Sequence, residues 1–152
     1  MTAVQTKTVF ITGASSGIGY ATARLFQDKG WNVVATLRKP EQAEALAALP
    51  RVLCLPLDVN DRTSIHAAVE KAIEHFGAID VLVNNAGIRV RKAFGEFTHE
   101  EFNRVVAINL RAPFIASQAV VPIMKSQGGG HIIHMASNLS IVASRFGAVY
   151  NI

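Results

Sequence analysis

The sequence predicts an α/β fold, a doubly wound parallel β-sheet that carries helices on both faces. Short apolar segments rich in β-branched residues alternate with longer amphipathic segments along the chain. The short segments do not alternate between apolar and polar residues, which is typical of strands buried on both faces of a parallel sheet. A glycine-rich turn, Gly13 to Gly19, joins the first short segment to the first long one, as expected at the start of such a sheet.

The first strand, turn and helix lie at the amino-terminal end of the chain. Residues Thr8 to Thr12 are β-branched or aromatic and run into Gly13, which predicts a strand followed by a turn. A helix is expected next, and it ends at Gly30. The helix is indicated by four apolar residues at helical spacing: Ile18, Ala21, Leu25 and Phe26.

Two more strands and two helices are expected in the next part of the chain. The pattern predicts a strand over Val33 to Thr36, an alanine-rich helix over Pro40 to Leu49 that its proline opens, and a strand over Val52 to Leu55. An amphipathic helix closed by Gly77 follows. Its apolar residues recur four positions apart, with a phenylalanine beside them: Ile65, Val69, Ile73 and Phe76.

The last elements complete a layer of about five strands. We expect a fourth strand over Ile79 to Val83, then one long or two consecutive helices from Thr98 to Ser126. Gly128 to Gly130 turns the chain into a fifth strand, His131 to Ala136. Because strands and helices alternate, right-handed crossovers give a Rossmann-type sheet that binds ligands at the carboxyl ends of its strands.

The composition indicates one folded domain and excludes other classes of protein. Hydrophobic residues make up 50% and charged residues 17% of the chain, which predicts a single globular domain over residues 1–152. The net charge is +4, but the lysines and arginines are scattered, so no nucleic-acid partner is expected. The longest apolar runs, such as Val81 to Val83, are too short for a bilayer, and a signal-peptide stretch is absent. A cytoplasmic protein without a membrane partner is therefore expected.

Neither cysteine nor metal chemistry is expected. Cys54 lies in the apolar run Val52 to Leu55, where a buried and inert thiol is favoured over a reactive one. The five histidines lack the spacing of metal ligands, so no metal site is predicted. Two of them, His131 and His134, flank an apolar pair and are expected to be strand residues.

The glycine-rich turn is a candidate phosphate-binding loop. Glycines there permit a tight turn and a close approach of the backbone to a pyrophosphate, whose charge the free N–H groups at the helix N-terminus stabilise. A purely structural turn is the alternative, and the position of the glycines between a strand and a helix favours the nucleotide. The candidate cofactor-binding residues in this turn are Gly13, Ser15, Ser16, Gly17, Ile18 and Gly19.

The spacing T-G-x-x-x-G-x-G, which begins at Thr12, resembles that of the short-chain dehydrogenase/reductase family. Two further motifs support the resemblance: Asp58-Val59 after the third strand, where the family contacts the adenine ring, and Asn84-Asn85-Ala86-Gly87 after the fourth, which matches the family's N-N-A-G. Ordinary turn chemistry is the alternative for the asparagines. The resemblance adds five candidate cofactor-binding residues: Asp58, Val59, Asn85, Ala86 and Gly87.

This resemblance covers essentially the whole chain and implies an NAD(P)H-dependent oxidoreductase. Such an enzyme transfers a hydride between a nicotinamide cofactor and a small-molecule carbonyl or alcohol substrate, and its intact form is expected to be a homo-oligomer. An unrelated flavin- or nucleotide-binding protein of the doubly wound type is a more remote alternative. The substrate itself cannot be identified from these residues.

The end of the second strand favours NADP over NAD. NAD-binding folds place an acid about 20 residues after the glycine loop to hold the ribose 2′-hydroxyl, whereas an arginine accommodates a 2′-phosphate. Here the strand ends in Leu37-Arg38-Lys39, without an acid. Arg38 offers a planar fork of donors and Lys39 a second positive charge. The alternative, under which NAD is the cofactor, is that both are solvated surface cations.

The resemblance also implies a catalytic set of Asn109, Ser137 and Tyr150, which occur in the family's order and at a common spacing. Tyr150 is the expected acid/base, Ser137 is expected to hydrogen-bond the substrate oxygen, and Asn109 to hold a water in the proton path. Taken singly, each has a structural alternative, as a helix kink, a strand-end hydroxyl or an ordinary amphipathic tyrosine. Ser140 and Ser144 compete with Ser137, which is preferred because it directly follows the strand end.

The family's lysine, four residues after the tyrosine, has no counterpart because the chain ends at Ile152. That lysine lowers the tyrosine pKa and holds the nicotinamide ribose, so a chain of these residues alone is expected to be inactive. We also expect it to associate through an uncovered fifth strand. Two interpretations remain: a fragment of an active reductase, or a non-catalytic nucleotide-binding or interaction module. Arg89, Arg91 and Lys92 are candidates for the mouth of an anionic-substrate pocket, although ordinary surface charge is favoured.

Overall fold

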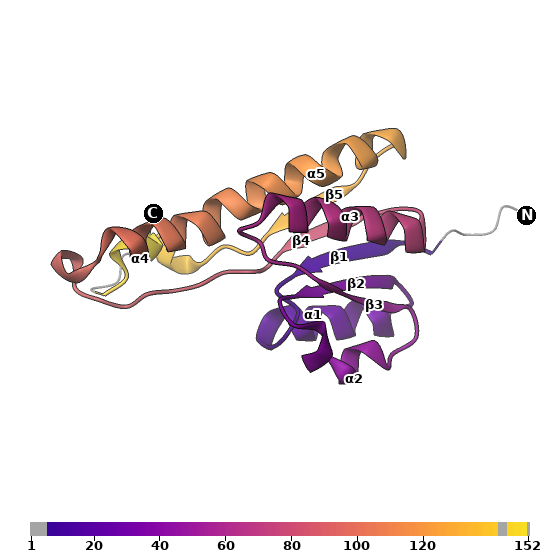
Figure 1. The fold of residues 1–152 in the computed structure, drawn as a ribbon, viewed down its shortest axis with the longest axis horizontal. Helices are drawn as coiled ribbons and strands as arrows, with labels where there is room; N and C mark the ends of the chain where they lie inside the picture. Colours follow the sequence, from indigo (N-terminus) through magenta and orange to yellow (C-terminus); the bar gives the residue numbers. More distant parts are fainter. Residues whose placement is uncertain (1–5, 143–145, 152) are drawn as a thin grey trace, which may run out of the picture.

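The computed structural model describes residues 6–142 and 146–151 of the chain. At its centre lies a five-stranded sheet in the order β3-β2-β1-β4-β5, and every neighbouring pair is parallel (Figure 1). The predicted Rossmann-type α/β sheet is therefore confirmed. Its strands are β1 (Thr8–Thr12), β2 (Asn32–Leu37), β3 (Val52–Pro56), β4 (Val81–Asn84) and β5 (His131–His134).

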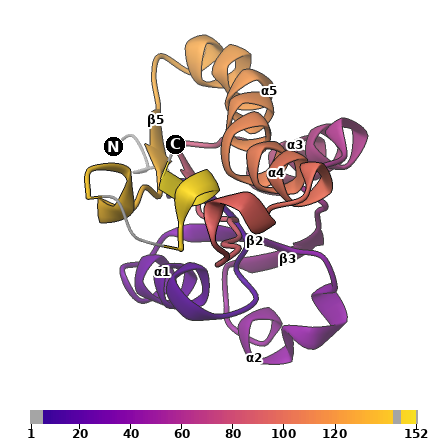
Figure 2. The ribbon, with the colours of Figure 1, turned by 90° about the vertical axis from the view of Figure 1, so that its left-hand side faces the viewer.

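Helices cover the two faces of the sheet (Figures 1 and 2). One face carries α1 (Gly17–Asp28) and α2 (Glu44–Ala47), and the other carries α3 (Arg62–Phe76) and α5 (Ala112–Ser126). Each face has its own hydrophobic cluster, and neighbouring residues of one strand point to opposite clusters. In β1, Phe10 faces the cluster of α3 and α5, whereas Val9 and Ile11 face that of α1. The apolar, non-alternating strand sequences follow from this double burial.

Helix α3 has the ends and the buried stripe that its sequence predicts. The Asp61 carboxylate accepts a hydrogen bond from the Thr63 backbone N–H at 2.8 Å, which caps the first turn. Gly77 ends the helix in the left-handed conformation, with φ of 80°. The side chains of Ile65 and Val69 are buried against the sheet.

Helix α1 forms where it is expected, but of the four residues of its predicted apolar face only Phe26 packs against the cluster on the sheet. Ile18 is 62% and Leu25 57% exposed, and Ala21 is exposed as well. The buried residues of α1 are instead Gly19, Ala23 and Gln27. The small residues Gly19 and Ala23 allow the helix to pack closely on the sheet, while Ile18 and Leu25 point outward.

The helix predicted over Pro40 to Leu49 is also wrong as a single element. The structure has a short 3₁₀ helix, η1 (Pro40–Gln42), and then the four-residue α2. Ala43 separates them with φ of −112° and ψ of 33°, which interrupts helical geometry. Burial of Ala43 and Leu46 against the sheet accompanies this break, so tertiary packing overrides the helical propensity of the alanines.

Two strands are displaced from their predicted bounds. β4 begins at Val81 rather than Ile79, because Asp80 closes the preceding turn: its carboxylate accepts from the Thr8 backbone N–H at 2.7 Å. β5 ends at His134 rather than Ala136, since its partner β4 ends at Asn84. Beyond that pair, the Met135 N–H still donates to the Asn84 carbonyl, after which β5 has no neighbour to pair with.

The long helix predicted from Thr98 to Ser126 is continuous but changes its winding. It begins as α4 (His99–Val106), passes through a π-helical turn, η3 (Ala107–Arg111), and continues as α5. In Figure 1 its α4 end projects beyond the carboxyl ends of the strands, where the carboxyl-terminal segment lies beside it. This projection gives the sheet edge a wall on one side.

This helix is also long and apolar enough to cross a membrane, judged by length and composition alone: it has 28 residues and a mean hydropathy of 1.4 over its most apolar stretch. The search for continuous apolar runs in the sequence did not find this helix, because single polar residues interrupt each run. In the structure its buried stripe packs against the sheet, through Ala112, Ala116, Val120 and Met124.

Candidate active site

The first candidate binding hollow lies at the carboxyl ends of β1 to β4 and has a volume of about 420 Å³. Most of the predicted cofactor-binding residues line it: Gly13, Ser15, Ser16, Arg38, Asp58, Val59, Asn85, Ala86 and Gly87. Ile18 lines a second, adjoining hollow instead, and Gly17 and Gly19 line neither. Segments far apart in the sequence therefore meet at one place, as the fold predicts for a ligand site.

The amino-terminal turn of α1 has free donors beside this hollow, which its N-cap residue Ser16 lines. Ser16 is the N-cap residue but makes no side-chain capping bond, and the first turn has no acidic residue. Among the described residues, no group accepts a hydrogen bond from the backbone N–H of Gly17, Ile18 or Gly19. A helix start with unpaired N–H groups suits an anionic group such as a pyrophosphate.

Two glycines of the loop, Gly13 and Gly19, permit close packing. Gly13 has φ of 71°, and a Cβ there would lie 2.9 Å from the Ala86 Cα. A Cβ at Gly19 would collide with the Gly13 carbonyl oxygen and with the Asn85 side chain. These glycines thus hold the loop against the N-N-A-G segment, so Gly19 shapes the site without lining it.

Thr12 and Asn85 join the ends of β1 and β4. The Thr12 hydroxyl accepts from the backbone N–H groups of Asn85 and Ala86, both at 3.0 Å. The Asn85 side-chain amide donates in return to the carbonyls of Thr12 at 3.0 Å and Gly13 at 2.9 Å. Asn85 therefore fixes the glycine loop with its side chain. Thr12 was not among the predicted site residues, although the first letter of the T-G-x-x-x-G-x-G motif marks it.

Two arginines enter the first hollow from different elements. Arg38 lies at the end of β2, next to the buried Leu37, and Arg104 reaches the hollow from α4. Neither forms an ion pair within the described part of the chain. Lys39, the second predicted cation, lines neither hollow. Arg104 was missed, because nothing in its local sequence distinguishes it from a surface arginine on a helix.

Asp58 contributes backbone order as well as a carboxylate. One of its carboxylate oxygens accepts from the Asn60 N–H at 2.9 Å, and its own N–H donates to the Ser64 hydroxyl at 3.0 Å. These bonds fix the loop between β3 and α3 at the rim of the hollow. The predicted adenine contact of Asp58 and Val59 stays a prediction.

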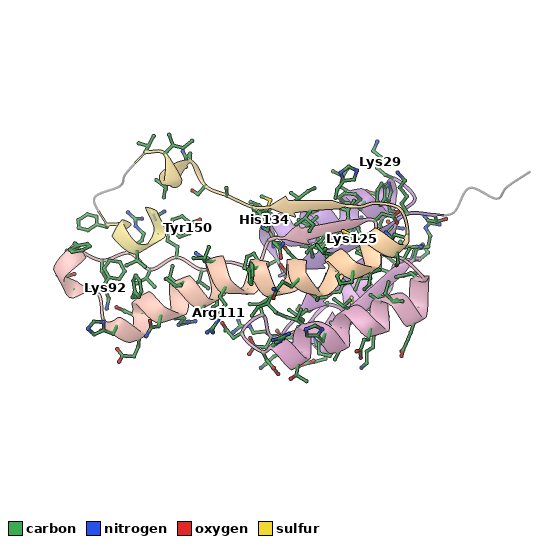
Figure 3. The ribbon with its side chains drawn as sticks, turned by 90° about the horizontal axis from the view of Figure 1, so that it is seen from above. Lys29, Lys92, Arg111, Lys125, His134 and Tyr150 are labelled. Atoms are coloured by element: carbon green, nitrogen blue, oxygen red, sulfur yellow. The ribbon has the colours of Figure 1, made fainter. Side chains whose placement is uncertain are left out.

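The second hollow, about 680 Å³, brings together the three predicted catalytic residues, Asn109, Ser137 and Tyr150. It shares the segment Asn85 to Ile88 with the first hollow, so the two adjoin along one wall. In Figure 3 the labelled Tyr150 lies between the long helix and the segment that follows β5. The proximity that the family's order implies is thus present, while the roles of the three residues stay predictions.

Asn109 lies in the π-helical turn η3 and clamps the shared wall. Its Oδ1 accepts from the Ile88 N–H at 2.9 Å, and its Nδ2 donates to the Ile88 carbonyl at 2.8 Å. Because both ends of the side-chain amide bind one residue, Asn109 fixes the backbone between the two hollows. A π-helical turn at this place is typical of functional sites.

Ser137 lies next to one short 3₁₀ segment of this hollow and Tyr150 within another. Ser137 precedes η4 (Asn138–Ser140), and its hydroxyl accepts from the Leu139 N–H at 3.2 Å. Tyr150 lies in η5 (Ala148–Asn151), where the Arg89 guanidinium is 5.6 Å from the centre of its ring. The competing Ser144 and the side chain of Ser140 lie outside the part that the structure describes.

His134 is a further residue of the second hollow that sequence reasoning placed only in a strand. It does lie in β5, paired in register with Asn84, and its Nδ1 is 3.4 Å from the Asn84 side-chain nitrogen. Figure 3 shows it at the sheet edge, on the side of Tyr150. The signal was the strand end itself, since the last residues of parallel strands face the ligand site.

Cys54 lies outside both hollows, on β3. Its side chain is half-buried, and this burial raises the pKa of the thiol above its ordinary value. A thiol that stays protonated is a poor nucleophile. The inert role predicted for Cys54 agrees with this position.

The chain matches the short chain dehydrogenase family over residues 7–151. It is 40% identical over 146 residues to 2-(R)-hydroxypropyl-CoM dehydrogenase of Xanthobacter autotrophicus, covering 90% of this chain and 58% of that protein. It is 35% identical to D-beta-hydroxybutyrate dehydrogenase of Rhizobium meliloti, covering 95% of this chain and 59% of that protein. The chain therefore spans less than two thirds of the length of these relatives.

Solved structures give the same result at the level of the fold. A short-chain dehydrogenase from Streptomyces avermitilis superposes with a TM-score of 0.90 at 31% identity, over 95% of this chain and 54% of that one. A putative short-chain alcohol dehydrogenase from Sinorhizobium meliloti superposes with a TM-score of 0.89 at 31% identity, over 95% and 59%. The chain belongs to the short-chain dehydrogenase family, whose members are oxidoreductases that use a nicotinamide cofactor, NAD or NADP, on small-molecule substrates.

Proposed function

We propose that this chain carries the cofactor site and the catalytic residues of an NADP(H)-preferring oxidoreductase, which transfers a hydride between the cofactor and a carbonyl or alcohol carbon. One observation supports it above all: the two hollows share the wall Asn85 to Ile88. A dinucleotide that lies across this wall has its phosphates at the glycine loop and its nicotinamide beside Asn109, Ser137 and Tyr150.

The first hollow suits a dinucleotide in both shape and charge. The unpaired N–H groups of the first turn of α1 are donors for the pyrophosphate, and Gly13 lets the loop that carries them pack against Ala86. Asp58 and Val59 follow β3 and line the same hollow, which supports the proposal that they contact the adenine end. The proposed fit therefore rests on backbone N–H groups that no described group of the protein accepts a hydrogen bond from.

Preference for NADP rests on the charges at the adenosine end. The buried Leu37 offers no carboxylate for a ribose 2′-hydroxyl, while Arg38 and Arg104 line the hollow without a carboxylate partner in the described residues. A guanidinium binds a phosphate with two parallel hydrogen bonds, which a hydroxyl cannot reproduce. A 2′-phosphate therefore gains more from this hollow than a hydroxyl does.

The second hollow supplies the groups for proton transfer. The bound cofactor gives or accepts a hydride at the nicotinamide C4, which reduces a carbonyl or oxidises an alcohol. In the direction of reduction, the Tyr150 hydroxyl gives its proton to the carbonyl oxygen, and the Ser137 hydroxyl holds that oxygen in place. Asn109 fixes Ile88 and with it the wall that would hold the nicotinamide.

A non-catalytic nucleotide-binding module is the second candidate. The family match removes the alternative of an unrelated flavin- or nucleotide-binding protein, since the chain belongs to the short-chain dehydrogenase family, but it does not separate an enzyme from a module that kept the cofactor loop. The gathering of Asn109, Ser137 and Tyr150 in one hollow favours the enzyme, because a module that only binds nucleotide has no need of it.

Calorimetric titration of the 152-residue chain with NADPH and with NADH tests the proposed cofactor preference. We expect NADPH to bind more tightly, and Arg38→Gln to weaken NADPH about 10- to 100-fold, the value of one charge-assisted contact, while NADH is unchanged. Lys39→Gln is the matched control, because Lys39 lines neither hollow. Tighter binding of NADH by the unaltered chain would overturn the NADP preference.

A further inference from the structure

The second hollow carries one permanent charge among its described lining residues, and that charge is positive. Arg89 is the charged residue, and the other ionisable side chains there are His134 and Tyr150. None of the described residues that line this hollow is an aspartate or a glutamate. A cavity with a cation and no acid favours ligands that carry a negative charge.

The backbone of Arg89 is held in place by the site itself. Arg89 directly follows Ile88, whose N–H and carbonyl both bind the Asn109 side chain. Its guanidinium lies 5.6 Å from the centre of the Tyr150 ring, within the range of a cation–π contact. The positive group is therefore kept beside the side chain that is proposed to exchange the proton.

The neighbouring cations differ from Arg89 in ways that single it out. The Lys92 Nζ pairs with the Glu101 carboxylate at 2.6 Å, so its charge is already balanced. Arg91 is exposed, as Arg89 is, but it lines neither hollow. In the part of the chain that the structure describes, Arg89 has no carboxylate partner. Its guanidinium keeps its donors for a ligand.

We infer that Arg89 binds an acidic group of the substrate, so that the substrate class is hydroxy acids and the corresponding oxo acids. A carboxylate accepts two parallel hydrogen bonds from a guanidinium, which fixes both the position and the direction of the substrate. The carbon chain then places its alcohol or carbonyl toward Ser137 and Tyr150, which line the same hollow. This inference rests on the proposed function, because the anion is that of the molecule whose oxygen Tyr150 protonates.

The test compares two probes of equal skeleton and different charge, 3-hydroxybutanoate and its neutral amide, 3-hydroxybutanamide. Ligand-observed NMR titrations of the 152-residue chain, with and without NADPH, give the two dissociation constants. We expect the acid to bind at least 10-fold more tightly than the amide, and Arg89→Gln to abolish this preference. Arg89→Lys keeps the charge without the planar fork, so it should retain part of the preference, and Arg91→Gln, the matched control, should retain all of it.

Equal binding of acid and amide by the unaltered chain would overturn the inference without any variant. A preference that survives Arg89→Gln would overturn it too, and so would an Arg89→Gln chain that loses NADPH affinity instead, since Arg89 would then belong to the cofactor. The NADPH titration in the same samples reports separately on the proposed function. If NADPH does not bind, the proposed function fails, while the cofactor-free titrations still decide whether Arg89 selects the acid.

Discussion

Two asparagine side chains at the site bind the protein backbone, although both were expected to bind a ligand or a water. The Asn85 side-chain amide donates to the carbonyls of Thr12 and Gly13, and the Asn109 side-chain amide donates to the carbonyl of Ile88. Each bond joins a loop to an element that is far away in the sequence. The asparagines therefore set the shape of the two hollows, and substitution of either is expected to disturb cofactor and substrate binding together.

The residue spacing identified the catalytic candidates but not their surroundings. Asn109, Ser137 and Tyr150 follow a family order that can be compared along the chain, and they meet in one hollow. Arg104 and His134 have no such mark, because their place in a hollow depends on how a helix face or a strand end is turned. The packing between elements decides this orientation, and a single sequence does not show that packing.

The role of Tyr150 is tested by Tyr150→Phe in a polypeptide that contains these residues and a lysine four positions after the tyrosine. The change removes a proton donor and little bulk, so kcat should fall by about 10²- to 10⁴-fold while NADPH affinity stays nearly constant. Steady-state kinetics and an NADPH titration measure the two effects. Tyr20→Phe, the other tyrosine and a residue of α1, is the control. Near-normal turnover of Tyr150→Phe would exclude Tyr150 as the acid/base.

At the scale of elements, the sequence predicts strands better than helix faces. The five strands were recognisable because burial on both faces demands apolar residues throughout. Helix α1 shows the limit: Ile18 and Leu25 have helical spacing, yet the sheet is contacted by Gly19 and Ala23. Large apolar side chains do not mark the face of a helix that contacts the sheet when close packing there requires small residues. The helix predicted over Pro40 to Leu49 is interrupted for a related reason, because Ala43 and Leu46 are buried against the sheet.

The start of the long helix depends on a reciprocal cap. The Thr98 hydroxyl accepts from the Glu101 N–H at 3.2 Å, and the Glu101 carboxylate accepts from the Thr98 N–H at 3.1 Å. We expect Thr98→Ala to lower the free energy of unfolding by about 1 kcal/mol, measured by urea denaturation, and Thr98→Ser to restore it. An unchanged stability of Thr98→Ala would show that tertiary packing alone places this end of the helix.

The same cap should respond to acid. The hydrogen bond from Lys92, and then that from the Thr98 N–H, holds the pKa of Glu101 below its ordinary value of 4.5. Because the folded-state pKa is depressed, the stability that Glu101 contributes is present above pH 4.5 and is lost as the pH falls further. Urea denaturation of Glu101→Gln should therefore differ from that of the unaltered chain at neutral pH and converge with it in acid. Parallel curves at all pH values would contradict this assignment.

At the scale of the whole molecule, β5 is an edge strand with exposed apolar residues. Ile133 is 44% and Met135 45% exposed, and in the sheet order β5 pairs on one side with β4. An exposed apolar edge is a template for pairing with another chain. We therefore predict that the 152-residue chain sediments as an oligomer or aggregate, and that Ile133→Lys shifts it toward the monomer. A monodisperse monomer of the unaltered chain in analytical ultracentrifugation would contradict this.

The central claim is that one nicotinamide cofactor lies across the wall that joins the two hollows. Hydrogen exchange with and without NADPH, in a polypeptide that contains these residues and a lysine four positions after Tyr150, tests it most directly, because slowed amide exchange maps the contacted backbone on both sides of the wall. We predict slower exchange over residues 13–19 and 36–38 in the first hollow, over the shared segment 85–88, and over 134–139 in the second. Protection confined to the first hollow, or no protection at saturating NADPH, would contradict the account.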